Sequence, residues 1–175
     1  MKIQIRRFNF ILLLTLGLVV SGCSSPGPKA KKVKEPTTLR FHLEVNRDGS
    51  DKSGPVTIGR SAPFGVNVQK EAFLTDFDIT DAAVVDDSMG GFSLRIQCNR
   101  RGTWLLEQYT TANKGRRAAI FCQFGTNAWW LAAPIMEKRI ADGAFSFTPD
   151  ASRVEADRIV RGLNQQGVDV KKDDR

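Results

Sequence analysis

Histidine is almost absent from this 175-residue sequence, and other residues that build common active sites are scarce. His42 is the single histidine, Tyr109 is the single tyrosine, and cysteine occurs three times. No Ser-His-Asp set, zinc-ligand cluster or phosphate-binding glycine loop is recognisable, and a single histidine argues against most hydrolytic and metal-dependent chemistry. The sequence therefore predicts a protein that is not an enzyme and that carries no metal and no cofactor.

An excess of basic charge is also missing from the part of the chain that should fold. The net charge of +7 falls to +4 without Lys2, Arg6 and Arg7, and residues 36–170 contain 16 basic and 16 acidic side chains. Nucleic-acid binding requires a basic face on the folded domain, so we predict no nucleic-acid partner. The lysines at 29–34 form either a solvated spacer or a stretch attracted to anionic lipid headgroups, at about 1 kcal/mol per lysine.

No apolar run is long enough for a stable membrane span, because the run at residues 10–20 is too short. It follows a positively charged start and ends at Val20-Ser21-Gly22-Cys23, which looks like a bacterial lipobox. We predict a lipoprotein signal peptide at 1–22 and acylation of Cys23. The alternatives are an ordinary secretory signal with an incidental cysteine, or an uncleaved anchor. More than one acyl chain would hold the protein stably on a membrane.

The remaining sequence predicts one folded domain on a tether. Residues 23–37 are rich in Lys, Pro and Ser and predict a flexible linker. We expect a single domain at 38–168, which is long enough for one sizeable core, and a charged tail at 169–175. A lipid-anchored protein of this kind would face the periplasm from the cell membrane or the outer membrane.

Alternating apolar residues predict short strands. Leu39, Phe41, Leu43 and Val45 point to one side of the first strand, and His42 lies on the other side, where we expect a solvated side chain without a catalytic role. The further strands are predicted at 56–58, 64–68, 82–85, 92–98, 118–124, 129–132 and 144–147.

Two longer helices are predicted between and after these strands. The first begins at Gly102-Thr103, ends at Asn113-Lys114-Gly115, and has its apolar stripe at Trp104, Leu105, Tyr109 and Ala112. The second begins at Thr148-Pro149-Asp150 and carries an apolar stripe at Ala156, Ile159, Val160 and Leu163. A short helical turn is predicted at 136–140. This order predicts an α+β fold, a mostly antiparallel sheet with two main helices on one face and a ferredoxin-like tendency.

Cys98 and Cys122 remain once Cys23 is acylated, and both fall on the apolar faces of their strands. They form a disulfide if their strands are neighbours and the two residues are level, or else they are two buried thiols. No histidine is placed to activate either thiol, so we predict no reactive cysteine.

Two pairs of residues are candidates for partner binding. Trp129 and Trp130 are adjacent in a strand and should face opposite sides, so one is an interface anchor or both are packed in the core. Arg116 and Arg117 lie between the first helix and the strand predicted at 118–124, where they are either solvated or bind acidic segments or lipid headgroups.

Five short motifs occur in order in the second half of the chain: Arg117-Ala118-Ala119-Ile120, Ala133-Pro134-Ile135, Ile140-Ala141-Asp142-Gly143, Phe145-Ser146-Phe147-Thr148 and Glu155-Ala156-Asp157-Arg158-Ile159. With shorter matches upstream, this series resembles the head of the first periplasmic domain of the protein-export membrane protein SecD. The resemblance covers about residues 73–164.

The resemblance implies a SecD-head-like fold and a domain that touches polypeptides outside the membrane, and it implies no enzyme. It covers only the head, so the proton-coupled activity of the SecD membrane bundle is not implied. We therefore predict a lipid-anchored envelope protein that binds exported polypeptides or the export machinery. The alternative is a structural envelope lipoprotein that binds one fixed protein partner and has no link to export.

Overall fold

The strands divide into two antiparallel sheets. The structure, a computed structural model, describes the backbone of residues 36–173 and the side chains of residues 36–165. The predicted signal peptide at 1–22, the acylated Cys23 and the linker up to residue 35 lie outside the described residues, as does the end of the predicted tail at 174–175.

The larger sheet has the strand order β2-β3-β1-β6-β7, and the smaller sheet has the order β4-β5-β8. The elements are β1 (Thr37–Glu44), β2 (Ser53–Ile58), β3 (Phe64–Thr75), η1 (Asp76–Asp78), β4 (Ile79–Asp86), β5 (Phe92–Cys98), α2 (Arg100–Ala112), β6 (Ala118–Phe124), β7 (Asn127–Ala132), β8 (Ala144–Phe147) and α3 (Arg153–Asp173). The predicted α+β class with antiparallel pairing is confirmed, although the strands form two sheets rather than one.

The chain passes from one sheet to the other at the short helix η1. Asp78 is buried there, and its Oδ2 accepts hydrogen bonds from the Thr75 backbone N–H (3.1 Å) and the Thr75 hydroxyl (3.3 Å). Asp78 Oδ1 also accepts a bond of 2.8 Å from Arg101 Nη1. These bonds end β3 and turn the chain, so that β4 starts a new sheet at Ile79.

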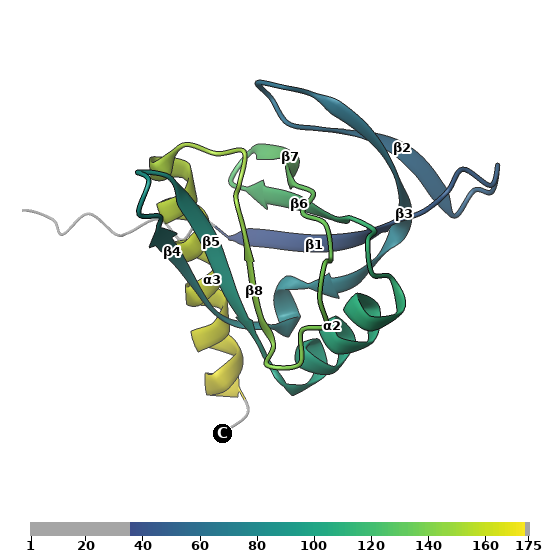
Figure 1. The fold of residues 1–175 in the computed structure, drawn as a ribbon. Helices are drawn as coiled ribbons and strands as arrows, with labels where there is room; N and C mark the ends of the chain where they lie inside the picture. The colour runs from purple at the N-terminus through teal and green to yellow at the C-terminus, as the bar shows by residue number, and fades with distance from the viewer. Residues whose placement is uncertain (1–35, 174–175) are drawn as a thin grey trace, which may run out of the picture. The chain divides into compact units, whose positions relative to one another are not determined.

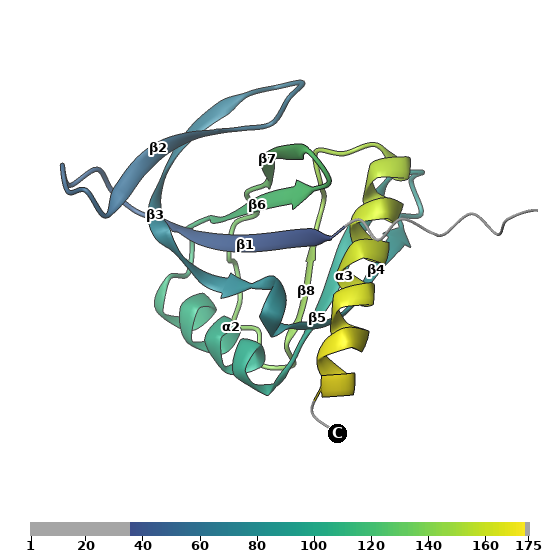
Figure 2. The same cartoon turned by 180° about the vertical axis from the view of Figure 1, so that it is seen from behind.

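The main core lies between the two sheets and α3. Phe41 in the central strand β1 is fully buried, and its ring centroid is 5.9 Å from that of Phe145 and 6.4 Å from that of Phe147, both in β8. Helix α3 contacts β4 most extensively and runs along it (Figures 1 and 2). The predicted stripe on α3 is confirmed, since Ala156, Ile159 and Leu163 are buried.

A second, smaller core occupies the other face of the larger sheet. The β2–β3 hairpin bends back until β2 contacts β7, and Figure 1 shows the curvature of β3. Register shifts between β1 and β3 on both sides of His42 are consistent with this bend, because bulges increase strand curvature. Ile58, Val66, Val68, Ala119 and Ala133 form this core.

This second core overturns the predicted solvation of the His42 side chain. The residue is 8% exposed, its Nδ1 donates to the Gln69 carbonyl at 2.9 Å, and its ring lies 5.2 Å from that of Trp130. Burial lowers the pKa of His42 below its ordinary value. The predicted alternation of β1 is confirmed by buried Leu39, Phe41 and Leu43, but the hairpin covers the face that we expected to be solvated.

Helix α2 begins two residues earlier than predicted, because Asn99 is its N-cap and accepts a hydrogen bond of 2.8 Å from the Gly102 N–H. The predicted stripe is correct in part, since Leu105 and Tyr109 pack against the main core. Trp104, at 59% exposed, and Ala112 do not, and the buried face is instead formed by Gly102, Leu106 and Thr110. A Cβ at position 102 would lie 2.8 Å from the Asp78 carbonyl oxygen. This close approach at a glycine sets which face of α2 packs.

Helix α3 begins at Arg153, later than the predicted start at Thr148-Pro149-Asp150. The Asp150 N–H donates to the Leu131 carbonyl in β7 at 2.7 Å, so the chain is still tied to the sheet at that point. Ser152 and Glu155 cap the helix instead: the Glu155 carboxylate accepts from the Ser152 N–H at 2.7 Å, and the Ser152 hydroxyl accepts from the Glu155 N–H at 3.3 Å. The helix continues to Asp173.

Candidate functional site

Trp129 and Trp130 lie on opposite faces of β7, as their spacing predicted, and both are partly exposed. Trp129 packs against the main core, and its Nε1 donates to the Asp150 carbonyl at 3.2 Å. Trp130 packs against the second core, where its ring centroid is 5.4 Å from that of Phe121. Both indoles therefore have structural contacts, and a role in partner binding stays a prediction.

Arg116 and Arg117 are partly buried and bind neighbouring backbone. Arg116 Nη1 donates to the Glu44 carbonyl at 3.1 Å, and Arg117 Nη1 donates to the Ala133 carbonyl at 2.9 Å. The Arg117 guanidinium also lies over the Phe64 ring, 5.3 Å from its centroid. These contacts join the residues just before β6 to the end of β1 and to the residue after β7. Partner binding by either arginine remains a prediction.

Cys98 and Cys122 are free buried thiols, so the structure has the second of the two predicted alternatives. They belong to different sheets, Cys98 to β5 and Cys122 to β6. Burial raises the pKa of each thiol to about 12, and the Asp78 carboxylate adds to the effect at Cys98. Neither is a thiolate nucleophile at neutral pH.

Arg60, in the β2–β3 loop, joins the bent hairpin to the start of α3. Its guanidinium donates to Glu155 Oε1 at 3.1 Å and Oε2 at 3.0 Å, and to the Asp150 carbonyl at 2.9 Å. Its Cζ lies 4.9 Å from the centroid of the Trp129 ring. The Arg60 guanidinium, with the Ser152 bonds, lowers the pKa of Glu155 to about 2 from an ordinary 4.5.

Glu155 should therefore make stability depend on pH in the acid range. Since its folded-state pKa is lowered, its contribution is complete above pH 4.5 and is lost as the pH falls towards about 2. We expect Glu155→Gln to lower the free energy of unfolding at pH 7 by less than about 1 kcal/mol, because the pair is solvent-accessible, and to flatten the pH dependence in this window. Urea unfolding at pH 7 and pH 3 measures both effects. Glu137 is an exposed carboxylate and serves as the control. If Glu137→Gln flattened the pH dependence of stability as much as Glu155→Gln, the assignment of this dependence to Glu155 would be wrong.

The segment after β7 forms an open edge of the larger sheet, and the helical turn predicted at 136–140 is wrong. Ile135 forms a bridge with Arg117, the Ala118 N–H donates to the Pro134 carbonyl (3.0 Å), and the Met136 N–H donates to the Arg116 carbonyl (2.8 Å). Backbone pairing with residues 116–118, at the start of β6, thus keeps residues 134–136 extended, and residues 136–140 form no helix. Ile135 is 45% exposed and Met136 is 2% exposed.

Strand β8 forms an edge of the smaller sheet. It pairs with β5 in the strand order β4-β5-β8, and no second partner strand is found within the described residues. Phe145 and Phe147 are buried in the core, whereas Ser146 between them is exposed. The alternation is that of a strand with one face on the core.

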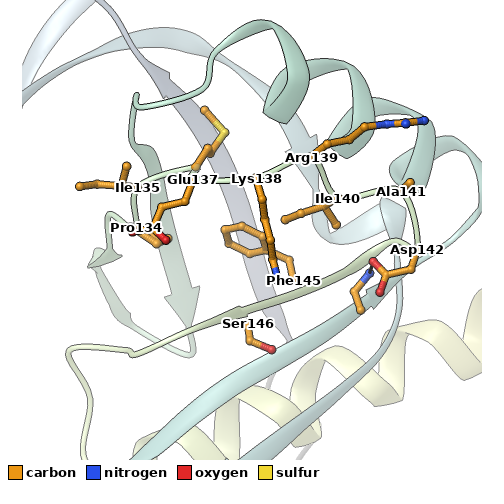
Figure 3. A pocket seen from close by; sticks show the side chains of 12 residues that line it. Pro134, Ile135, Glu137, Lys138, Arg139, Ile140, Ala141, Asp142, Phe145 and Ser146 are labelled. Atoms are coloured by element: carbon orange, nitrogen blue, oxygen red, sulfur yellow. Dashed lines mark hydrogen bonds between the residues drawn. The ribbon is translucent and has the colours of Figure 1, made fainter.

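A groove of about 600 Å³ lies between these two edges and is lined by residues 134–142 and 144–146. We call it the edge groove. Figure 3 shows Phe145 between the segment at 134–142 and β8, with Lys138 and Ile140 reaching from that segment towards β8. Exposed Glu137, Lys138 and Arg139 give its rim both signs of charge. The sequence did not predict this site, because its pattern indicated a helical turn at 136–140 in place of an extended segment.

Two other features are absent from the described residues, a membrane-spanning helix and a metal site. None of their helices has the combination of length and apolarity needed to cross a bilayer. No group of three or more His, Cys, Asp or Glu side chains among them is placed to hold a metal ion. The fold and the edge groove define a small two-sheet α+β module with an open strand edge.

Comparison with known proteins confirms the predicted resemblance to the SecD head. The chain is 30% identical to protein translocase subunit SecD of Rhodothermus marinus over 128 residues, which are 73% of this chain and 19% of that subunit. It therefore spans about a fifth of the length of the SecD that it matches. No family model matches the chain.

Solved structures show the same fold. A structure described as a membrane component SecDF that enhances protein export matches with a TM-score of 0.53 at 19% identity, over 75% of this chain and 63% of that chain. SecDF in a super-membrane-facing form matches with a TM-score of 0.51 at 20% identity, over 75% of this chain and 19% of that one. At this identity the likeness establishes the fold.

Proposed function

We propose that this protein is a non-catalytic lipoprotein of the bacterial cell envelope whose SecD-head-like domain binds polypeptides and assists their export. In this proposal acylated Cys23 holds it on the periplasmic face of the cell membrane or the outer membrane, without metal or cofactor. The sequence similarity to a protein translocase subunit supports the link with export.

The edge groove is the observation that supports the proposed binding of polypeptides. It combines a buried apolar floor at Met136 and Phe145 with exposed Ile135 and Ser146 at its sides. Its volume is within the usual range of ligand sites, about 300–1,000 Å³. The mixed charge of its rim favours neither acidic nor basic ligands, which suits a site for varied polypeptides.

Site-specific crosslinking in cells tests this function. A photoreactive amino acid at Ile135 should capture a defined secretory precursor while it is being exported, and a precursor without its signal sequence should not be captured. Val154 in α3, which is 68% exposed, is the matched control position. Equal yields at 135 and 154, or no capture of the precursor at 135, would contradict the proposal.

The lipid anchor has a separate test. Cys23→Ser should abolish incorporation of labelled fatty acid and release the protein from the membrane fraction. Incorporation that persists in this variant would overturn the assignment of Cys23.

The second candidate function is assembly with one fixed envelope partner. It is favoured by two exposed aromatic residues, Phe77 in η1 (77% exposed) and Trp104 in α2 (59%), whose elements are joined by the Arg101–Asp78 bond. Exposed aromatic side chains are common interface anchors. Crosslinking from position 104 to one protein, at a yield independent of export, would favour this function.

A further inference from the structure

The backbone at the edge groove is oriented to hydrogen-bond an additional strand. In an antiparallel ladder, residues alternate between those whose N–H and C=O face the partner strand and those whose groups face away. Pro134 and Met136 bond towards β6, so the N–H and C=O of Ile135 between them face away from β6. One wall of the groove therefore offers a backbone donor and acceptor.

The same reasoning applies to β8 on the other wall. The Gly143 carbonyl accepts from the Cys98 N–H at 2.9 Å, and Phe145 lies opposite Ile96, two residues away on each of the two antiparallel strands. Gly143, Phe145 and Phe147 thus direct their backbone towards β5, and Ser146 directs its N–H and C=O away from it. The Ala144 N–H, which also faces outward, is already bonded to Asp142 Oδ1 at 3.1 Å.

We propose that the edge groove binds an extended polypeptide segment as an added β-strand along the outer edge of β8, opposite Ile135. This inference rests on the proposed function and names its substrate class: unfolded chain, recognised by its backbone. Bonds to Ser146 give affinity for any extended sequence, and the apolar floor favours an apolar residue at every second position. Folded proteins are excluded, because their backbone groups are already paired.

The residues around the groove limit unwanted pairing. Pro134 has no N–H to offer, and Lys138 extends across the hollow in Figure 3. Proline and lysine are characteristic protections of exposed strand edges. Lys138 is exposed and flexible enough to swing aside when a segment enters. The edge is thus guarded against self-association and still accessible to a ligand.

Binding of a defined peptide to the full-length protein in detergent tests the proposal. The probe is a fluorescein-labelled nine-residue peptide of alternating apolar and polar residues. Its matched control has the same side chains but N-methyl groups at alternate backbone nitrogens, which block one hydrogen-bonding edge. We expect the N-methylated peptide to bind at least tenfold more weakly by fluorescence anisotropy. Equal affinity of the two peptides would overturn strand addition without requiring any variant.

Matched variants locate the strand. Ser146→Pro removes the outward N–H and should weaken binding at least tenfold, whereas Ser146→Ala keeps it and should bind within about twofold of the wild type. Thr57→Pro is the control for a proline at the edge of a sheet, because Thr57 is exposed and lies in the edge strand β2. The Lys70 N–H donates to the Lys52 carbonyl, so every second residue after Lys52 bonds towards β3. Thr57 lies between two such residues, and its backbone N–H and C=O therefore face outward, like those of Ser146. Circular dichroism checks that each variant folds. Unchanged binding by folded Ser146→Pro would overturn the proposal.

The outcomes separate this inference from the proposed function. Capture of the precursor at Ile135, together with equal binding of both peptides, keeps polypeptide binding and overturns strand addition. Absence of both capture and peptide binding overturns both. Concentration-dependent self-association that is lost in Ser146→Pro would assign the groove to a second copy of the chain and overturn the proposed occupant. Peptide binding that appears only after removal of residues 23–35 would assign it to the chain's own linker, with the same consequence.

Discussion

Phe41→Ala should lower the free energy of unfolding by about 3–5 kcal/mol. The side chain is fully buried, and its ring makes edge contacts with Phe73 in the larger sheet and with Phe145 and Phe147 in the smaller one. Its removal would leave a cavity where the two sheets meet. Urea unfolding followed by circular dichroism measures the loss.

Phe77→Ala is the control for this change. It removes the same group from a side chain that is 77% exposed, so we expect a loss below about 0.5 kcal/mol. Similar losses in the two variants would mean that Phe41 does not hold the sheets together. We also expect Phe41→Ala to weaken peptide binding at the edge groove, since Phe145 rests on the Phe41 ring.

Asp78→Ala should lower the free energy of unfolding by about 2–3 kcal/mol, because it removes hydrogen bonds to a buried carboxylate. The Asp78 side chain is 2% exposed and bonds both the backbone N–H and the hydroxyl of Thr75. Without the carboxylate, the Thr75 N–H loses its partner at the point where the chain changes sheet. Thermal and urea unfolding both measure the effect.

Arg101→Ala separates the turn from the ion pair. The Arg101 side chain is 71% exposed, so its bond to Asp78 should contribute less than about 1 kcal/mol. If Arg101→Ala were as destabilising as Asp78→Ala, the ion pair rather than the turn at Thr75 would carry the stability.

Local alternation predicted the strands whose two faces differ in burial. The bounds of β5 at 92–98 and β6 at 118–124 agree with the sequence because Leu94, Ile96, Ile120 and Cys122 contact the core while Arg95 and Gln123 are exposed. The stripe of α3 was predictable for the same reason, since one face of that helix packs on a sheet.

The errors arise where distant segments decide the local environment. His42 has a solvent-facing position by alternation, but a hairpin bent at β-bulges covers it. The packed face of α2 depends on Gly102 approaching Asp78, a contact that residue pattern alone does not reveal. Asp150 resembles a helix start, but its backbone is bonded to β7.

The edge groove could not be predicted from the sequence for a different reason. Its walls come from two sheets, and it exists because residues 134–136 stay extended beside β6 while β8 has a single partner strand among the described residues. The sequence carries Ile135 and Ser146 without any sign that their backbone groups face a common hollow.

The bond between Arg60 and Glu155 has a consequence for how the chain acquires its structure. It joins residues 95 positions apart, and β1 pairs not only with β3 but also with β6, which the chain reaches only after β4, β5 and α2. Synthesis delivers the N-terminal part first, so β1 waits for β6, and Arg60 waits for Glu155, until most of the domain has been made. Such non-local topology slows folding. The newly synthesised chain should therefore need protection from proteases and aggregation for longer than a helical bundle of equal length.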